Sequence, residues 1–196
     1  MPEFEGLSDQ GICHPTDGTH ELAWLDRWAA DGLSSEVAQN RFEHLPAVAV
    51  EEMTGLWRGT ELPTGHPLDG LLGLYRWRGK RFVTPDFVDP LLFDRGQDIL
   101  ALNPAVLPVG LALALPRLVR TGAAQALFDI MLPMVATRAP KARLRGVERG
   151  GVVSAAMIYD AKPIIDHFRR VDEDRMLGLM ELRSTRAPYF FLLTRE

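Results

Sequence analysis

Residues 142–195 read ARLRGVERGGVVSAAMIYDAKPIIDHFRRVDEDRMLGLMELRSTRAPYFFLLTR and contain five strand-like runs. Turn sequences separate these runs at Arg149-Gly150-Gly151, Asp160-Ala161-Lys162 and Asp172-Glu173-Asp174. Such short runs, recurring about every ten residues, are typical of an antiparallel meander. This half of the chain therefore predicts a β-sandwich or β-barrel.

A second strand-rich block begins at Met53. Its runs GLWRGT, LLGLYRW and KRFVT, at residues 55–60, 71–77 and 80–84, are rich in aromatic and apolar residues and are separated by Gly, Pro and Asp. Five C-terminal strands alone would leave an exposed edge, which the N-terminal strands could close. We therefore expect one antiparallel β-barrel in a mainly β protein with helical additions (α+β).

The other segments predict helices. The sequence ELAWLDRWAADG at residues 21–32 places Leu22, Leu25 and Trp28 at helical spacing, and a second helix follows with Ser34 or Ser35 as its N-cap and Pro46 at its end. Residues 117–132 predict a third helix whose apolar face contains Val119, Ala123, Ala126, Leu127 and Ile130, closed by Pro133. The expected organisation is an N-terminal helical segment at 1–50, a strand block at 51–96, a helical insert at 97–140 and a strand block at 141–196, with 51–196 as one barrel-like unit.

Composition excludes several classes of protein. The chain has 196 residues, of which 46% are hydrophobic, and a net charge of −4, so nothing in its charge favours nucleic acid as a partner. Residues 99–116 carry no charge, but three prolines make a membrane span unfavourable and favour a buried, irregular connection. The acidic N-terminus is unlike a signal peptide and Cys13 is the only cysteine, so we expect a cytoplasmic protein.

Motifs for several common chemistries are absent. The sequence contains no Gly-x-Gly-x-x-Gly, no phosphate-binding loop and no Gly-x-Ser-x-Gly, and Ser154 lies in an apolar run without a nearby base. It also has neither His-x-x-x-His nor a Cys/His cluster. A nucleotide-binding fold, a serine hydrolase and a metal site are therefore not expected.

Two sets of motifs resemble a known bacterial family. The stretches GLWRG at 55–59, LPTGHPLDGLL at 62–72 and WRGKRF at 77–82 resemble the GXWXG-domain family. KARLR at 141–145, Tyr159-Asp160, PIIDHFR at 163–169 and LGLME at 177–181 resemble the domain of unknown function that accompanies it, with Met180-Glu181 where the family pattern has Met-Asp. The resemblance implies an architecture and carries no activity.

Gly-x-Trp at the start of a strand meander is also similar to the opening of calycin barrels, the lipocalin-like group that includes nitrobindin-type haem binders. Glycine lets the first strand approach the barrel floor, and Trp57 can close that end as an apolar plug or contact a ligand. We expect no cofactor. A haem would need an axial ligand, and His66 and His167 are the only histidines in the strand-rich regions.

Polar residues within the strand runs are the candidate site. In residues 163–171, alternation puts His167 and Arg169 on one face and Asp166 on the other, so one of the two sets could lie in a low-dielectric cavity; the alternative is an edge strand with solvated charges. His66 and Asp69 could form an imidazole–carboxylate pair, although Asp69-Gly70 is also a turn signature. The candidate catalytic residues are His66, Asp69, Asp166 and His167, and the candidate ligand-binding residues are Trp57, Trp77, Lys80, Tyr159 and Arg169.

Two functions fit these residues. The first is binding of a small apolar or aromatic molecule in the barrel cavity. The second is a cofactor-independent isomerase, cyclase or lyase that uses the same cavity for general acid–base catalysis. The sequence leaves open which applies, whether the protein is an enzyme and whether it forms a homodimer.

Overall fold

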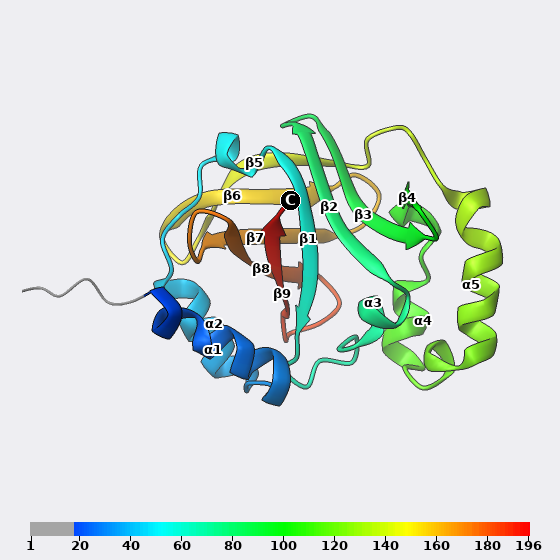
Figure 1. Ribbon diagram of the computed structural model, residues 1–196, viewed down its shortest axis with the longest axis horizontal. Coiled ribbons are helices and arrows are strands. Elements are labelled where there is room, and N and C mark those ends of the chain that lie inside the picture. The colour runs from blue at the N-terminus through cyan, green and yellow to red at the C-terminus, as the bar shows by residue number, and fades with distance from the viewer. Residues whose placement is uncertain (1–17) are drawn as a thin grey trace, which may run out of the picture.

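The computed structural model describes residues 18–196, with side chains from residue 23 onward. Cys13 and the rest of residues 1–17 of the predicted N-terminal segment lie outside the described residues. Eight antiparallel strands close into a barrel in the order β2-β1-β9-β8-β7-β6-β5-β3, with β2 pairing back to β3 (Figure 1). The strands are β1 (Gly55–Leu62), β2 (Trp77–Thr84), β3 (Phe87–Arg95), β5 (Ala142–Arg149), β6 (Val152–Tyr159), β7 (Ile164–Arg170), β8 (Arg175–Leu182) and β9 (Tyr189–Arg195).

Two helices pack on the outside of the barrel. They are α1 (Gly18–Asp31) and α2 (Ser35–His44), and the Ser34 side chain caps α2 by accepting from the backbone N–H of Val37. Trp28 of α1 and Phe42 of α2 are fully buried against Phe190 of β9. The predicted N-terminal helices and the predicted barrel are both confirmed.

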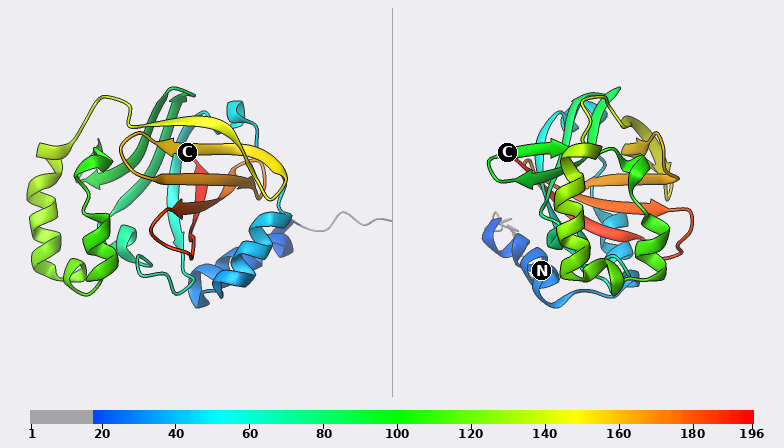
Figure 2. Two further views of the ribbon diagram at one scale, coloured as in Figure 1. Left: turned by 180° about the vertical axis from the view of Figure 1, so that it is seen from behind. Right: turned by 90° about the vertical axis from the view of Figure 1, so that its right-hand side faces the viewer.

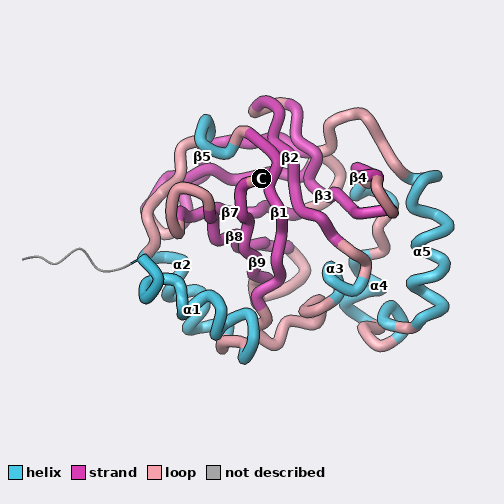
Figure 3. The backbone as a smooth tube through the Cα atoms, viewed as in Figure 1, coloured by secondary structure: helices cyan, strands magenta, loops and turns pink. Residues whose placement is uncertain are grey.

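The insert lies on the opposite side of the barrel from α1 and α2 (Figure 2). It contains β4 (Asp98–Ala101), α4 (Val109–Ala114), α5 (Gly122–Val135) and short 3₁₀ turns at Pro104–Val106 and Leu118–Arg120. A further 3₁₀ turn, Val50–Met53, precedes β1. Figure 3 shows that helices and loops dominate this region, whereas strands dominate the barrel. No helix within residues 18–196 is both long and apolar enough to cross a membrane.

The prediction for the insert was wrong in three respects. Helix α5 spans Gly122–Val135 and contains Pro133, rather than spanning 117–132 and ending at Pro133. The apolar connection is not buried throughout, because Val106 and Leu115 remain 49% and 50% exposed. In α5, Leu127 and Ile130 point outward at 57% and 68% exposure, while Phe128 and Leu132 pack against the barrel core. Periodicity identified the helix but not its inward face, because both faces of α5 are apolar.

Two elements of the N-terminal block also differ from the prediction. Residues 71–74, expected in a strand, form the short helix α3 (Leu71–Leu74), in which the backbone N–H groups of Leu72 and Gly73 donate to the Glu61 carboxylate of β1. Strand β3 was not predicted, because it contains Pro90, a residue that argues against a strand interior. Both differences depend on contacts with other strands.

Glycines make the close packing of the barrel possible. A Cβ atom on Gly59 would lie 2.2 Å from the ring of Trp77, and one on Gly178 would lie 2.2 Å from the ring of Phe191. Trp57 is fully buried at the end where β1 begins, and its indole N–H donates to the Met53 carbonyl at 2.8 Å. Gly59 and Trp57 of the GLWRG stretch are therefore both fixed by packing.

Candidate functional site

A buried ion pair crosses the barrel interior. Lys80 on β2 and Asp166 on β7 approach to 2.8 Å between Nζ and Oδ2, and their side chains are 3% and 1% exposed. Alternation along each strand explains their direction, since Phe82 and Phe168, two residues further on, belong to the same interior core. Of the two faces predicted for residues 163–171, the one with Asp166 therefore lies inside the barrel. Strand β7 pairs with β6 and β8 and is not an edge strand.

Tyr159 completes the group, which we call the Lys80 cluster (Lys80, Tyr159 and Asp166). Lys80 Nζ lies 3.4 Å from the Tyr159 hydroxyl, and this hydroxyl lies 3.5 Å from Asp166 Oδ2. Lys80 also donates to the Pro90 carbonyl at 3.1 Å. Between Gly79 and Arg81 the β2–β3 register shifts, so that two residues of β3, including Pro90, lie opposite Lys80 alone. The ammonium group therefore has three oxygen partners.

Aromatic rings surround the ammonium group of Lys80. The Nζ atom lies 4.9 Å from the ring centroid of Phe191, 5.6 Å from that of Trp77 and 5.7 Å from that of Tyr159. Aromatic faces attract a cation at such distances, more strongly where water is excluded. The surroundings combine apolar walls with a single charged pair.

Burial perturbs the protonation of every member of the cluster. It lowers the pKa of Lys80, although the charge of Asp166 acts in the opposite direction. Burial raises the pKa of Asp166, opposed by the charge of Lys80, and it raises the pKa of Tyr159 well above its ordinary value. Each shift favours the uncharged form: those of Lys80 and Asp166 move the pKa toward neutrality, and that of Tyr159 moves it away from neutrality.

Two buried polar atoms, one in the cluster and one on an aromatic ring that surrounds Lys80, lack a hydrogen-bond partner in the described part of the chain. They are Asp166 Oδ1, an acceptor, and Trp77 Nε1, a donor. A buried polar group without a partner costs about 1–3 kcal/mol, so the hydrogen-bonding capacity of these two atoms is unused at a cost to stability.

A second polar group lies at the end of the barrel where β1 ends and β9 begins. The Tyr189 hydroxyl donates to Glu61, which also accepts from the backbone N–H groups of Leu72 and Gly73 at 3.1 and 2.7 Å. The His66 ring lies 5.6 Å from that of Tyr189, its Nδ1 accepts from the Leu68 N–H at 3.2 Å, and burial lowers its pKa. The lowered pKa favours the neutral ring, and because Nδ1 accepts a hydrogen bond, Nε2 carries the proton in that form.

The Asp69 carboxylate organises the turn before α3. Its Oδ2 accepts from the backbone N–H groups of Thr64, Gly65 and His66 at 2.9, 2.8 and 2.8 Å. Asp69 therefore acts as a turn residue that accepts from nearby backbone N–H groups, the second of the two roles considered for it from the sequence. The hydrogen bonds that hold His66 and Asp69 in place are made with backbone groups.

His167 and Arg169 point out of the barrel, toward β8 and α2. His167 Nε2 lies 3.4 Å from Glu181, and burial together with the charge of Arg149 lowers the pKa of His167. The Arg169 guanidinium lies 5.5 Å from the ring of Phe42 and donates to the Arg149 carbonyl at 3.2 Å. Of the two histidines considered as haem ligands, His167 therefore faces away from the interior.

The structure brings Trp77, Lys80, Tyr159 and Asp166 together and leaves His167 and Arg169 on the opposite face of β7. Sequence reasoning missed Glu61 and Tyr189. Glu61 had a signal, since it follows Trp57 and Gly59 on the same face of β1. Within residues 18–196, no group of three or more His, Cys, Asp or Glu side chains could hold a metal ion.

The fold and the site define a calycin-like barrel with a charged pair in its aromatic interior. Residues 40–97 match the family described as GXWXG protein, and residues 140–195 match a domain of unknown function, DUF4334. A protein from Thermomonospora curvata, known from a crystal structure, is 32% identical over 90% of this chain and 99% of its own, with a TM-score of 0.64. The chain belongs to this GXWXG family with its accompanying C-terminal domain. No curated protein matches the chain.

Proposed function

We propose that the barrel interior binds a small apolar or aromatic molecule that carries one polar group. The observation that carries the proposal is the unpartnered Oδ1 of Asp166, held by Lys80 and Tyr159 among aromatic rings. The rings suit an apolar body. Asp166 Oδ1 can accept from a hydroxyl group of such a molecule, and Trp77 Nε1 can donate to one of its oxygens.

Binding of 2-naphthol, measured by isothermal titration calorimetry, tests this proposal. Asp166→Asn removes the charge and is expected to weaken 2-naphthol binding by about tenfold or more, because a hydrogen bond to a charged group is lost. Naphthalene, which lacks the hydroxyl, should bind both proteins equally. Tyr159→Phe serves as a second variant if Asp166→Asn unfolds the barrel.

Asp89→Asn is the matched control. Asp89 is also a buried carboxylate, 2% exposed, but it pairs with Arg81 at 2.7 Å on the outer side of the β2–β3 hairpin. This variant should bind 2-naphthol like the wild type. Equal weakening by Asp89→Asn and Asp166→Asn, or no saturable binding of 2-naphthol by the wild type, would contradict the proposal.

A second candidate function is general acid–base catalysis on such a molecule, as in a cofactor-independent isomerase, cyclase or lyase. The raised pKa of Asp166 and its unpartnered oxygen favour it. In its ionised form Asp166 would take a proton from carbon next to a carbonyl group, and Trp77 Nε1 would donate to the oxygen on which negative charge develops. Returning the proton to a different atom would complete an isomerisation.

Deuterium exchange into 1-tetralone, followed by NMR in D₂O, tests this activity without knowledge of the substrate. The wild type should accelerate exchange at the carbon beside the carbonyl, and Asp166→Asn should reduce the acceleration by about 10²-fold or more. Asp89→Asn again serves as the control. A wild-type rate equal to the buffer rate would leave binding as the function.

The insert is the cover that a ligand would have to pass. Phe128 of α5 packs against Phe93 and Tyr75 at centroid distances of 5.2 and 4.7 Å, and Arg120 donates to the backbone carbonyls of Pro67 and Asp69. Phe128→Ala should therefore speed association of 2-naphthol in stopped-flow measurements, whereas Leu127→Ala, at an exposed position of the same helix, should not. Equal association rates would place the opening elsewhere.

A further inference from the structure

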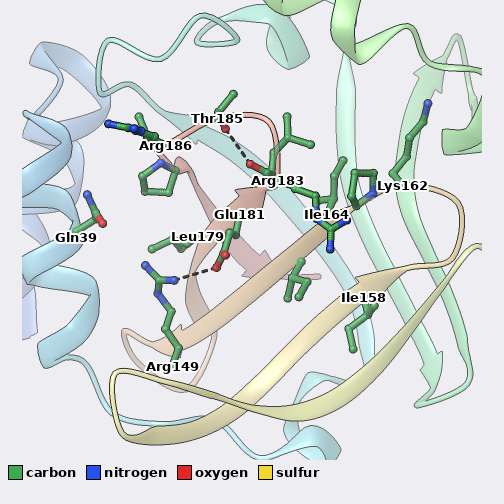
Figure 4. A pocket seen from close by; sticks show the side chains of 15 residues that line it. Gln39, Arg149, Ile158, Lys162, Ile164, Leu179, Glu181, Arg183, Thr185 and Arg186 are labelled. Atoms are coloured by element: carbon green, nitrogen blue, oxygen red, sulfur yellow. Dashed lines mark hydrogen bonds and ion pairs between the residues drawn. The ribbon is translucent and has the colours of Figure 1, made fainter.

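A pocket of about 600 Å³ lies on the outer face of β6, β7 and β8, away from the Lys80 cluster. The β8–β9 connection and Gln39 of α2 complete its walls (Figure 4). Its apolar surface comes from Ile158, Ile165, Leu179 and neighbouring side chains. This volume is that of a small-molecule site.

The charged residues that line this pocket are mostly cationic. Arg149, Lys162, Arg183 and Arg186 contribute four positive charges, and Glu181 contributes the one negative charge. The whole chain has a net charge of −4, so the excess of positive charge is a local property of this pocket. Such a concentration of one sign attracts anions.

Arg149, which lines the pocket, and Arg169, which donates to the Arg149 carbonyl, both keep donors without a hydrogen-bond partner within residues 18–196. Arg169 is 2% exposed, and its Nε and Nη1 have no hydrogen-bond partner among the described residues; the same holds for Nε of Arg149. Arginine presents its donors in a planar fork that matches carboxylate and phosphate groups. The donors available here exceed what the single carboxylate of Glu181 can accept.

Glu181 occupies the position that an external anion would share or take. Figure 4 shows its carboxylate directed at Arg149, at 3.0 Å, and it lies 3.4 Å from His167 Nε2. Glu181 is exposed, so it can move aside at little cost. We propose that this pocket binds an organic anion, a carboxylate or phosphate monoester on a small apolar body, with Arg149 contacting the charged group and Arg183 and Arg186 adding positive charge to the surrounding walls.

Titrations of the whole protein with phenyl phosphate and with benzoate, by calorimetry and amide NMR, test the proposal and distinguish the two anions. Benzyl alcohol is the neutral control. Arg149→Gln should weaken binding of the preferred anion by about tenfold or more, because a charge-assisted hydrogen bond is lost. Glu181→Gln should instead strengthen it severalfold, because a competing carboxylate is removed.

Arg143→Gln is the matched control, since Arg143 also lies on β5 and also pairs with a carboxylate, Asp160, at 3.0 Å, but does not line the pocket. It should leave anion affinity unchanged. Asp166→Asn should do the same, which separates this site from the barrel interior. Any of three results would overturn the proposal: no saturation up to about 10 mM anion, equal weakening by Arg143→Gln, or amide shifts confined to strands around Lys80.

Discussion

Replacing Lys80 by methionine removes the cation of the buried pair and keeps a long apolar side chain. Lys80 and Asp166 are 3% and 1% exposed and separated by 2.8 Å, so Lys80→Met leaves a carboxylate in the interior with Tyr159 as its remaining side-chain partner. Burying an unpaired charge is among the costliest single changes in a protein. We therefore expect Lys80→Met to destabilise the barrel strongly.

The size of the effect follows from opposing terms. At 2.8 Å and an effective dielectric constant of about 20, the attraction between the charges is about 6 kcal/mol. Removing two ions from water costs several kcal/mol for each, so the intact pair contributes little net stability. Removing one partner leaves the cost without the attraction, which gives about 3–5 kcal/mol of destabilisation.

Urea unfolding of four proteins measures these terms: the wild type, Lys80→Met, Asp166→Leu and the double variant. The double variant should lie within about 1–2 kcal/mol of the wild type or above it, because neither charge remains buried. The coupling energy between the two positions should therefore be about 3 kcal/mol or more. Additive losses, with the double variant the least stable, would refute the argument.

Acid conditions provide an independent check. The charge of Lys80 lowers the pKa of Asp166, so Lys80→Met raises the folded-state pKa further above the unfolded value. Between these values the folded state binds more protons than the unfolded state, and stability falls as pH rises through the folded pKa. The difference between Lys80→Met and the wild type should thus be larger at pH 7 than near pH 4.

Three further replacements probe packing, a histidine and the outer face. Gly59→Ala should cost about 1–3 kcal/mol in urea unfolding, because its Cβ would meet the Trp77 ring at 2.2 Å, whereas Gly110→Ala in α4, with no atom within 4 Å, should not destabilise. Burial lowers the pKa of His66, so below about pH 6.5 the unfolded state binds a proton more readily than the folded state and stability falls. His66→Asn keeps an acceptor for the Leu68 N–H and should therefore reduce the loss of Tm between pH 7 and pH 5. His44→Asn, at an exposed position, is the control. His167→Gln should leave 1-tetralone exchange unchanged, because His167 points away from the interior; a loss as large as that of Asp166→Asn would contradict this placement.

The sequence allowed most of the barrel to be predicted, because the alternation and turns of residues 142–195 are local signals. It did not show which face of β7 is inside, since both faces mix apolar and ionisable residues and the choice depends on what packs against each: the barrel core on Phe168 and α2 on Arg169. The helix at Leu71–Leu74 depends on hydrogen bonds to the Glu61 carboxylate of β1. Strand β3 accommodates Pro90 at a register shift, where the Pro90 carbonyl accepts from Lys80. These contacts join different elements 10–12 residues apart, so the pattern within a single strand does not reveal them.

The glycines near Trp57 connect the family motif with the interior pair. Without a Cβ on Gly59, the Trp77 ring can lie inside the barrel, 5.6 Å from the Lys80 ammonium. A Cβ on Gly79 would lie 1.9 Å from the Trp57 carbonyl oxygen, so Gly79 lets β2 approach β1 closely just before Lys80. A side chain at either position would displace the strand or ring that surrounds Lys80. The motif residues therefore shape the candidate site through packing, and replacing Gly59 should disturb ligand binding as well as stability.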